Sequence, residues 1–340
     1  MRISVVIPLY NEAVNLDPLY ERLNVALDRI ACDFELVFVN DGSTDQSVTI
    51  LERLADQDSH VKFISLSRNF GHEIASTAGL DAADGDAVVL MDADLQDPPE
   101  LIEKLLEPWL QGCDVVYARR RRRHGEGFLK QATSFLFYRL MMRLSSLNLP
   151  LDTGDFRLMD RRVVEAFRQF SESQRFVRGL VTWMGFRQAA VEYDRPARHA
   201  GEGKYSTMKL IKLGMDAVLS FSAVPLRLVS VLGLICILTA ILAAGGVMAG
   251  QLWSGDTLSG NTITNLCLVL FSGTQLVGLG IIGEYVGRVH REVLNRPLYL
   301  IERQKGWGAK LERGRSIAES RTRSARSVSD HSHTVQQEAA

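Results

Sequence analysis

The chain has 340 residues, a formal net charge of −1 and four widely separated cysteines. This length allows one sizeable domain with an appendage, and the near-neutral charge argues against a nucleic acid or another polyanion as a partner. The cysteines match no metal-ligand spacing, so we expect them to be reduced packing residues in a mainly cytosolic protein.

Strand and helix patterns alternate over the first 120 or so residues. Apolar runs predict strands at 3–8, 35–40, 61–66, 87–91 and 114–118. Helical patterns lie between them, at 14–30, 45–56, 73–82 and 99–111. This alternation is typical of an α/β fold with a mostly parallel, doubly wound sheet, in which ligands bind at the carboxyl ends of the strands.

The most informative motif follows the fourth predicted strand. Asp92, Asp94 and Gln96 come directly after an apolar run, and alternate residues of an extended segment point the same way. Two carboxylates and an amide oxygen suit Mg²⁺ or Mn²⁺, which proteins usually hold with one or two carboxylates and substrate phosphates. The motif therefore predicts a metal that binds a substrate diphosphate, although acidic pairs also occur in solvated loops.

The first two predicted strands also end in polar sequence. The first ends at Pro8 and is followed by Tyr10 and Glu12, and the second is followed by Asp41. A carboxylate at such a strand end can accept hydrogen bonds from a ribose or a base, or it can be a turn residue, whereas Asp45 is interpreted as a helix cap. The glycine patterns of nicotinamide dehydrogenases and P-loop kinases are absent from the sequence.

Basic residues in two segments are candidates for contact with phosphate. Arg119 begins a run of five arginines, and the planar fork of arginine suits phosphate. A solvated run or a contact with anionic lipid is the alternative. Arg198 and Lys204 flank a glycine-containing loop that can bind phosphate or act as a plain linker.

A carboxylate farther along the chain is a further candidate. Asp155 follows Gly154 in a stretch without periodicity, which predicts a turn that presents a carboxylate, or a structural Asp–Arg pair. The histidines His72 and His199 stand apart from any motif, and we interpret both as structural.

Two apolar segments, 229–248 and 265–282, each approach the roughly 20 residues that cross a bilayer. Their outer flanks are basic, and the loop between them has no Lys or Arg. We therefore expect transmembrane helices at 224–250 and 263–286 in the cytoplasmic membrane, with residues 1–206 and both termini in the cytoplasm. A pair of buried core helices is the alternative.

Three further segments have distinctive composition. Residues 128–147 and 207–222 mix aromatic and aliphatic side chains with Lys and Arg, which predicts amphipathic helices on the membrane surface or packed on the α/β domain. Residues 308–340 are rich in Ser and Arg with few apolar residues, so we expect them to be disordered.

Together these motifs resemble the family 2 glycosyltransferases. The resemblance is carried by V-I-P-x-Y-N-E, N-D-G-S-x-D, D-A-D-L-Q-D-P-P, G-D-F-R-L-M and G-x-x-K-Y-S, and it covers residues 3 to about 302. More narrowly, the chain is similar to polyprenyl-phosphate glycosyltransferases, which are related to dolichyl-phosphate mannose synthase. With G-E-Y-V-G-R after the second apolar segment, it looks like the bactoprenol glucosyltransferases of bacteria.

This resemblance implies a GT-A fold, a UDP- or GDP-sugar donor, Mg²⁺ or Mn²⁺, a polyprenyl phosphate acceptor and inversion at the anomeric carbon. It implies that the nucleoside is held by Pro8, Tyr10, Glu12 and Asp41. The metal and the diphosphate are then bound by Asp92, Asp94 and Gln96. The same resemblance assigns phosphate contacts to Arg119, Arg198 and Lys204, and it gives catalytic roles to Asp94 and Asp155. A homotetramer with contacts from 288–307 is also implied.

The sugar and the role of Asp155 stay open at this stage. We expect glucose from UDP-glucose, with mannose from GDP-mannose or an aminoarabinose from its UDP donor as alternatives. An acceptor phosphate with a second pKa of about 6 needs no strong base, so Asp155 is expected to position the acceptor or the metal. A processive polysaccharide synthase, whose usual Q-x-x-R-W motif is absent, and a non-catalytic membrane scaffold are the competing interpretations.

Overall fold

The computed structural model describes residues 1–121, 153–173, 175–194 and 260–307, with scattered residues between 231 and 246. The chain divides into two compact units, one of residues 1–127, 149–204 and 296–340 and one of residues 128–148 and 205–295. The predictions for 128–147, 207–222 and 308–340, and those for Arg198 and Lys204, lie outside the described residues.

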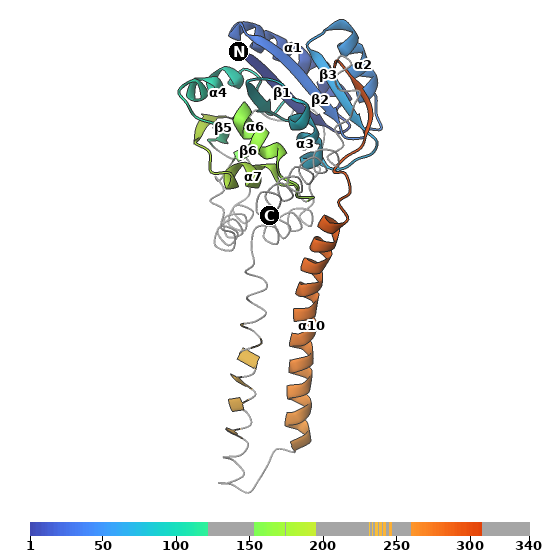
Figure 1. Ribbon diagram of the computed structural model, residues 1–340, viewed down its shortest axis with the longest axis vertical. Helices are drawn as coiled ribbons and strands as arrows, with labels where there is room; N and C mark the ends of the chain where they lie inside the picture. The colour runs from blue at the N-terminus through green and yellow to red at the C-terminus, as the bar shows by residue number, and fades with distance from the viewer. Residues whose placement is uncertain are drawn as a thin grey trace, which may run out of the picture. The chain divides into compact units, whose positions relative to one another are not determined.

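The first unit contains an eight-stranded sheet with the order β7-β5-β6-β4-β1-β2-β3-β8. Its strands are β1 (Arg2–Leu9), β2 (Asp33–Asn40), β3 (Val61–Leu66), β4 (Ala87–Leu90), β5 (Val115–Arg120), β6 (Thr153–Asp160), β7 (Gln188–Tyr193) and β8 (Ile301–Lys305). Figure 1 shows three of these strands, β1, β2 and β3, side by side. Only β6 and β8 in this sheet run antiparallel to their neighbours. The prediction of a mostly parallel α/β sheet is therefore confirmed.

Helices cover both faces of the sheet. They are α1 (Ala13–Ile30), α2 (Ser47–Gln57), α3 (His72–Ala82), α4 (Leu101–Leu110), α6 (Arg161–Arg168) and α7 (Val177–Trp183). Helix α1 packs with α2 and α4, whereas α3 packs with α6 and α7. Alternate residues of β1 face the two helix layers. Val5 belongs to the core that includes α1, and Val6 lies against Gly79 of α3. A Cβ atom at residue 79 would lie 2.2 Å from Val6 Cγ1, so α3 needs glycine there to approach the sheet.

Five elements of the first unit were not predicted, namely β6, β7, β8, α6 and α7. The prediction of a turn at Asp155 is wrong, because this residue lies near the start of strand β6. Strand β6 is buried on both faces and includes Arg157, which is 4% exposed. A buried arginine and carboxylate within a strand interrupt the apolar pattern by which the other central strands are found.

Part of the segment 288–307, which was expected to contact a neighbouring subunit, joins the sheet of its own chain as strand β8 (Ile301–Lys305). Strand β8 pairs with the edge strand β3, and the Tyr299 hydroxyl donates to Asp81 Oδ2 at 3.0 Å. The main-chain hydrogen bonds of β8 cover an edge that is otherwise open to pairing with another chain. The tetramer stays a prediction.

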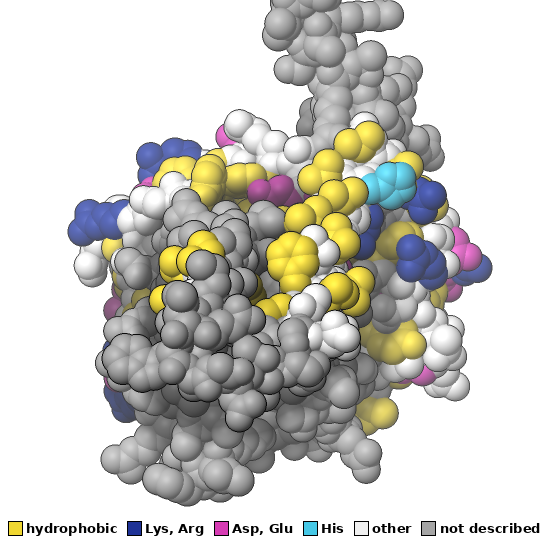
Figure 2. Space-filling view, turned by 90° about the horizontal axis from the view of Figure 1, so that it is seen from below, with side chains coloured by type: hydrophobic (Ala, Val, Ile, Leu, Met, Phe, Trp, Pro, Cys, Tyr) yellow, Lys and Arg dark blue, Asp and Glu magenta, His cyan; other side chains and the backbone are white. Residues whose placement is uncertain are grey.

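The second unit contains the long helix α10 (Gly260–Val293), which includes the segment 263–286. Many of its apolar side chains are exposed, among them Leu268, Phe271, Leu276, Val277, Leu279, Ile282, Val286, Val289 and Val293. Apolar side chains are also prominent among the described residues in Figure 2. In the part of the chain that the structure describes, no helix is long and apolar enough to cross a membrane. The two transmembrane helices stay a prediction.

A buried carboxylate at the amino-terminal edge of the sheet gives a first testable result. Glu35 is fully buried and accepts hydrogen bonds from Lys62 Nζ at 2.7 Å and from the Asp84 N–H at 2.8 Å. We expect Glu35→Ala to lower the free energy of unfolding by about 3–5 kcal/mol, because it leaves the ammonium of Lys62 without its buried partner. Chemical denaturation of the full chain measures this loss, and an unchanged unfolding midpoint would contradict it.

The same carboxylate predicts a dependence of stability on pH. Burial alone would raise the pKa of Glu35, but Lys62 and Ser4 outweigh burial and lower it. The stabilisation is then fully present above the unfolded pKa of about 4.3, and it is lost as the pH falls through the lower folded pKa. The Glu35→Ala chain should therefore lose less stability than the wild type on acidification.

Candidate active site at the carboxyl edge of β4

The pairing of β4 with β6 brings two carboxylates to the same edge of the sheet. Leu90 at the end of β4 is the register partner of Arg157 in β6. Because β6 runs antiparallel, the residues before Arg157 lie beyond the carboxyl end of β4. Asp92 follows Leu90 by two positions, and Asp155 precedes Arg157 by two positions. The two aspartates therefore meet at the edge where open α/β sheets bind ligands.

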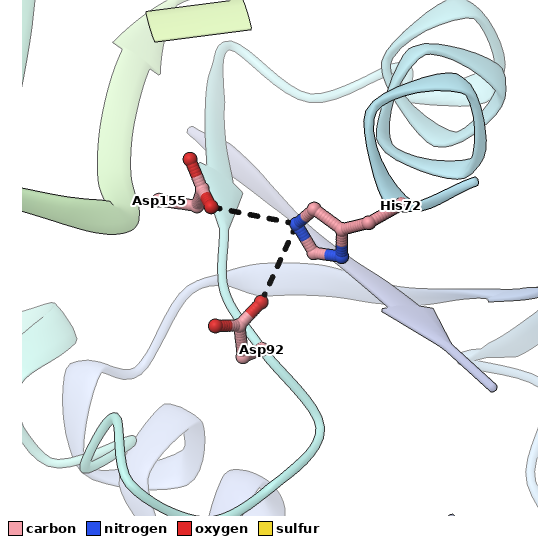
Figure 3. Close-up of side chains that lie close together, drawn as sticks. All are labelled: His72, Asp92 and Asp155. Atoms are coloured by element: carbon pink, nitrogen blue, oxygen red, sulfur yellow. Dashed lines mark ion pairs between the residues drawn. The ribbon is translucent and has the colours of Figure 1, made fainter. Parts of the chain in front are cut away.

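A histidine completes this group (Figure 3). His72 is the first residue of α3, and its Nε2 atom lies 3.6 Å from Asp92 Oδ1 and 3.5 Å from Asp155 Oδ2. The ligand atoms of the three residues all lie within 4.8 Å of one another. His72 is therefore not isolated from the other candidate residues, although it stands apart from them in the sequence. One feature of the sequence could have identified His72 as a candidate. It begins a helix that follows a buried parallel strand, and Asp41 and Asp92 also follow buried parallel strands.

Asp41 holds the loop that leads to His72. Its two carboxylate oxygens accept the N–H groups of Phe70 and Gly71 at 2.7 and 2.9 Å. Gly42 follows with φ +66°, and a Cβ atom there would lie 2.4 Å from the Arg68 carbonyl carbon. The loop after β2 and the loop before α3 are thus fitted closely together. The predicted contact of Asp41 with the nucleoside stays a prediction.

The charges of the group support one another. Burial alone would lower the pKa of His72, but the hydrogen bond to Asp155 and the charge of Asp92 outweigh burial and raise it from 6.5 to about 10. Burial would also raise the pKa of Asp155, but Arg178 and His72 hold that pKa well below its usual range. At neutral pH the group therefore consists of an imidazolium between carboxylates.

Two arginines surround Asp155. Arg178 of α7 donates from Nε to Oδ1 at 2.8 Å and from Nη2 to Oδ2 at 3.1 Å. Arg157 donates to the backbone oxygens of Gly154 and Asp155, both at 3.2 Å, and burial lowers its pKa to about 10. An Asp–Arg pair is thus present at Asp155, and the role of this carboxylate stays a prediction. Its partner Arg178 carries no motif of its own and is found only through the packing of α7.

The loop after β4 is bent. Leu95 has φ +60°, and the N–H of Gln96 donates to Asp94 Oδ1 at 3.1 Å. The premise that residues 92–96 are extended is therefore wrong, because a left-handed residue between Asp94 and Gln96 interrupts the alternation of side-chain directions. The roles of Asp94 and Gln96 in binding metal stay predictions.

Polar contacts also join the loops after β1 and β2. Asn11, between Tyr10 and Glu12, accepts the N–H of Thr44 at 2.8 Å. Asp45 accepts the N–H groups of Ala13 and Ser47 at 3.1 and 3.0 Å. Asp45 thus holds the first N–H of both α1 and α2, and only its contact with α2 was predicted. Pro8, Tyr10 and Glu12 lie at the carboxyl end of β1, beside that of β4, and their contact with a nucleoside stays a prediction.

The first residue of the arginine run has a partner on a neighbouring strand. Arg119 of β5 is the register partner of Glu192 of β7, and the two side chains form an ion pair. Both are well exposed, at 46% and 42%. An exposed pair of this kind contributes little to stability. The contact of Arg119 with a phosphate stays a prediction.

His72, Asp92 and Asp155 have the chemistry of a divalent-metal site. One imidazole nitrogen and two carboxylate oxygens suit Mn²⁺ and similar ions, provided that the imidazole is neutral when it binds. This group shares Asp92 with the set Asp92, Asp94 and Gln96 that the sequence predicts. The residues present therefore fit a bound cation, and Asp92 belongs to both possible ligand sets.

Comparisons with known proteins identify the family. The sequence profile described as "Glycosyl transferase family 2" matches residues 4–168. A protein of Bacillus subtilis named as an uncharacterized glycosyltransferase, YkcC, is 47% identical over 303 residues, 89% of this chain and 94% of that protein. The chain belongs to glycosyl transferase family 2. This family 2 protein is a glycosyltransferase, and its first unit has a GT-A-like α/β fold.

Other relatives of this family 2 glycosyltransferase carry more specific names. The bactoprenol glucosyl transferase of Shigella phage SfV is 38% identical over 305 residues, 90% of this chain and 99% of that protein. The SfII prophage-derived bactoprenol glucosyl transferase of Shigella flexneri is 39% identical over 303 residues, 89% of this chain and 98% of that protein. The resemblance predicted from the motifs is confirmed.

Solved structures are more distant from this glycosyltransferase. Mannosyl-3-phosphoglycerate synthase from Rubrobacter xylanophilus has a TM-score of 0.43 and 19% identity, over 64% of this chain and 72% of that one. Glucosyl-3-phosphoglycerate synthase from Mycobacterium tuberculosis, in complex with Mn²⁺, UDP-glucose and phosphoglyceric acid, has the same score and identity, over 64% and 77%. Likeness at this level carries no information on substrate or metal.

Proposed function

We propose that this glycosyltransferase transfers a hexosyl group, glucose from UDP-glucose, to a polyprenyl phosphate at the cytosolic face of the membrane. The reaction depends on a divalent metal and inverts the anomeric carbon. The observation that carries the proposal is the likeness to bactoprenol glucosyl transferases over nearly the full length of those proteins. The cluster of His72, Asp92 and Asp155 at the carboxyl edge of the sheet supplies a fitting site.

The chemistry of the proposed transfer is a displacement at the anomeric carbon. The bond from this carbon to the diphosphate oxygen breaks, and the nucleoside diphosphate leaves with the electron pair. A phosphate oxygen of the lipid forms the new bond from the opposite side. This oxygen is ionised at neutral pH, because the second pKa of a phosphate monoester is about 6. A bound divalent cation supplies stabilisation of the negative charge on the diphosphate.

The residues of the site suit a reaction that needs stabilisation of negative charge and no strong base. Asp155 is held ionised by Arg178 and His72, which keep its pKa well below its usual range, so it is a poor acceptor of a proton. Its part is to orient its neighbours. With no metal bound, His72 carries a positive charge between Asp92 and Asp155, and it must lose this proton when it acts as a metal ligand.

The experiment that tests this function uses the full chain in bacterial membranes. The membranes are incubated with labelled UDP-glucose, GDP-mannose or UDP-aminoarabinose, together with Mg²⁺ or Mn²⁺, and the lipids are extracted. We expect label from UDP-glucose to enter a polyprenyl phosphate that releases its sugar in mild acid. Label that enters from one of the other donors would correct the sugar, and label in a long polysaccharide would favour a processive synthase.

Attachment to the membrane is part of this proposal. A polyprenyl acceptor stays in the bilayer, and α10 exposes apolar side chains along its length, as a lipid environment requires. We propose that 224–250 and 263–286 cross the bilayer, with both termini in the cytoplasm. Alkaline carbonate washing of membranes should leave the chain in the pellet, and its release into the wash would count against the two spans.

A further inference from the structure

Among the described residues, Arg178 makes the closest side-chain contacts with Asp155. Its two donor nitrogens lie 2.8 and 3.1 Å from the two carboxylate oxygens, whereas His72 Nε2 lies at 3.5 Å. The Asp155 side chain is 11% exposed and that of Arg178 is 32% exposed. A two-pronged pair between arginine and a carboxylate fixes the orientation of the carboxylate as well as its position.

The helix that carries Arg178 depends on a contact with Glu73 of α3. Helix α7 has seven residues, and Phe176 before it provides no side-chain cap. Helices this short are unstable by themselves. The first N–H of α7, from Val177, donates instead to Glu73 Oε2 at 2.9 Å. Glu73 therefore replaces the missing cap and ties α7 to α3.

These contacts form a closed circuit around Asp155. Helix α3 supplies two consecutive residues, of which His72 faces Asp155 and Glu73 holds α7. Helix α7 then returns Arg178 to the same carboxylate. The orientation of Asp155 is thus fixed by two helices that are themselves linked. Such a circuit resists small displacements, and displacements of about 1 Å in an active site can cost about 10²-fold in rate.

We propose that Arg178 is a positioning residue for sugar transfer, which acts by fixing Asp155 and, through Asp155, His72. Glu73 supports it by holding the start of α7. This inference rests on the proposed function and deepens it. A competing role for an arginine beside a reaction centre is direct contact with the acceptor phosphate. The two roles differ in the kinetic constant that a substitution changes.

The experiment compares Arg178→Gln, Arg178→Lys and a control in the full chain. We expect Arg178→Gln to lower kcat by about 10²-fold, with the KM values for nucleotide sugar and lipid phosphate within about threefold of wild type. Arg178→Lys should recover about tenfold of this loss, because lysine keeps the charge and loses the two-pronged geometry.

Arg162→Gln is the matched control. The exposed Arg162 pairs with Asp114 at 2.5 Å and with Asp160, at the other end of β6, at 3.2 Å. Residues 155 and 160 lie about 17 Å apart along the strand, at about 3.3 Å per residue. The substitution thus removes the Arg–Asp pairs at the far end of the same strand, away from the reaction centre, and kcat should stay within about twofold of wild type, since ion pairs of an exposed arginine contribute little.

Glu73 gives a second test that does not alter Arg178. Glu73→Gln keeps an oxygen that accepts the Val177 N–H, so we expect it to retain most of kcat. Glu73→Ala removes that oxygen and should reproduce the loss of Arg178→Gln. Circular dichroism melting curves identify any variant that does not fold. If Arg178→Gln or Glu73→Ala does not fold, the conservative variants Arg178→Lys and Glu73→Gln test the proposal.

Three results would overturn the proposal. A kcat near wild type in Arg178→Gln would reduce the pair to a surface contact. A rise of tenfold or more in the KM for lipid phosphate, with kcat retained, would make Arg178 a substrate-binding residue. Equal losses of kcat in Glu73→Gln and Glu73→Ala would show that the loss does not come from the hydrogen bond between Glu73 and the Val177 N–H. A wild type without lipid-linked product refutes the proposed function instead, and the variants are then compared with the acceptor that the wild type uses.

Discussion

Replacement of Asp92 by alanine is expected to lower the turnover of sugar transfer by about 10³-fold, at the upper end of the loss for one group that stabilises developing charge. Asp92 follows the carboxyl end of β4 and lies 3.6 Å from His72. It belongs both to the metal set predicted from the sequence and to the group that the structure brings together. Its loss therefore removes a ligand from both sets. The measurement is kcat with saturating nucleotide sugar and metal.

Asp86→Ala is the matched control for this loss. Asp86 lies just before the other end of β4, is well exposed, and accepts the N–H of Arg2 at 2.8 Å. Both substitutions remove an aspartate next to the same strand, but only one removes it from the candidate site. Turnover in Asp86→Ala should stay near wild type. An Asp92→Ala chain that folds and keeps a tenth or more of the wild-type turnover would contradict the assignment of Asp92.

The strand ends that form this site could be predicted from the sequence because the strands themselves are buried. The central strands β1, β2 and β4 are covered on both faces, so they appear as continuous apolar runs whose ends are easy to see. Polar residues such as Asp41 and Asp92 directly after those runs must then lie at one edge of a parallel sheet. The sequence alone accordingly places these side chains at that edge.

The other half of the site depends on contacts that no local pattern contains. Asp155 reaches Asp92 because β6 runs antiparallel next to β4, and the direction of that strand is set by the whole sheet. Arg178 reaches Asp155 because α7 packs on α3. His72 was visible as a residue at the start of a helix, but its partners come from two other elements. Sequence reasoning therefore located the edge and missed the residues that surround Asp155.

The bend after β4 is a second limit of local reasoning. An acidic residue at every second position suggests a common direction only where the backbone is extended. Leu95 adopts φ +60°, a conformation that is uncommon for a residue other than glycine and is not visible in the sequence. Two metal-ligand sets therefore share Asp92: one with Asp94 and Gln96, and one with His72 and Asp155.

Single substitutions that spare Asp92 separate these two sets. We expect His72→Ala to raise the metal concentration for half-maximal turnover by about 10- to 100-fold, a loss of the size seen when groups around a metal site are removed. Gln96→Ala should change it by less than about threefold. The reason is geometric, because the ligand atoms of His72, Asp92 and Asp155 lie within 4.8 Å of one another on three separate elements.

Titration of each variant with Mn²⁺ and with Mg²⁺, at fixed nucleotide sugar, gives this concentration directly. Binding of Mn²⁺ to the folded chain without substrate, followed by electron paramagnetic resonance, provides a readout that is independent of turnover. His60→Ala controls for the removal of a histidine, because His60 lies outside the site and contacts Asp58. The opposite result, with a large change in Gln96→Ala and none in His72→Ala, would place the cation with Asp92, Asp94 and Gln96 and leave His72 as a charged neighbour of Asp155.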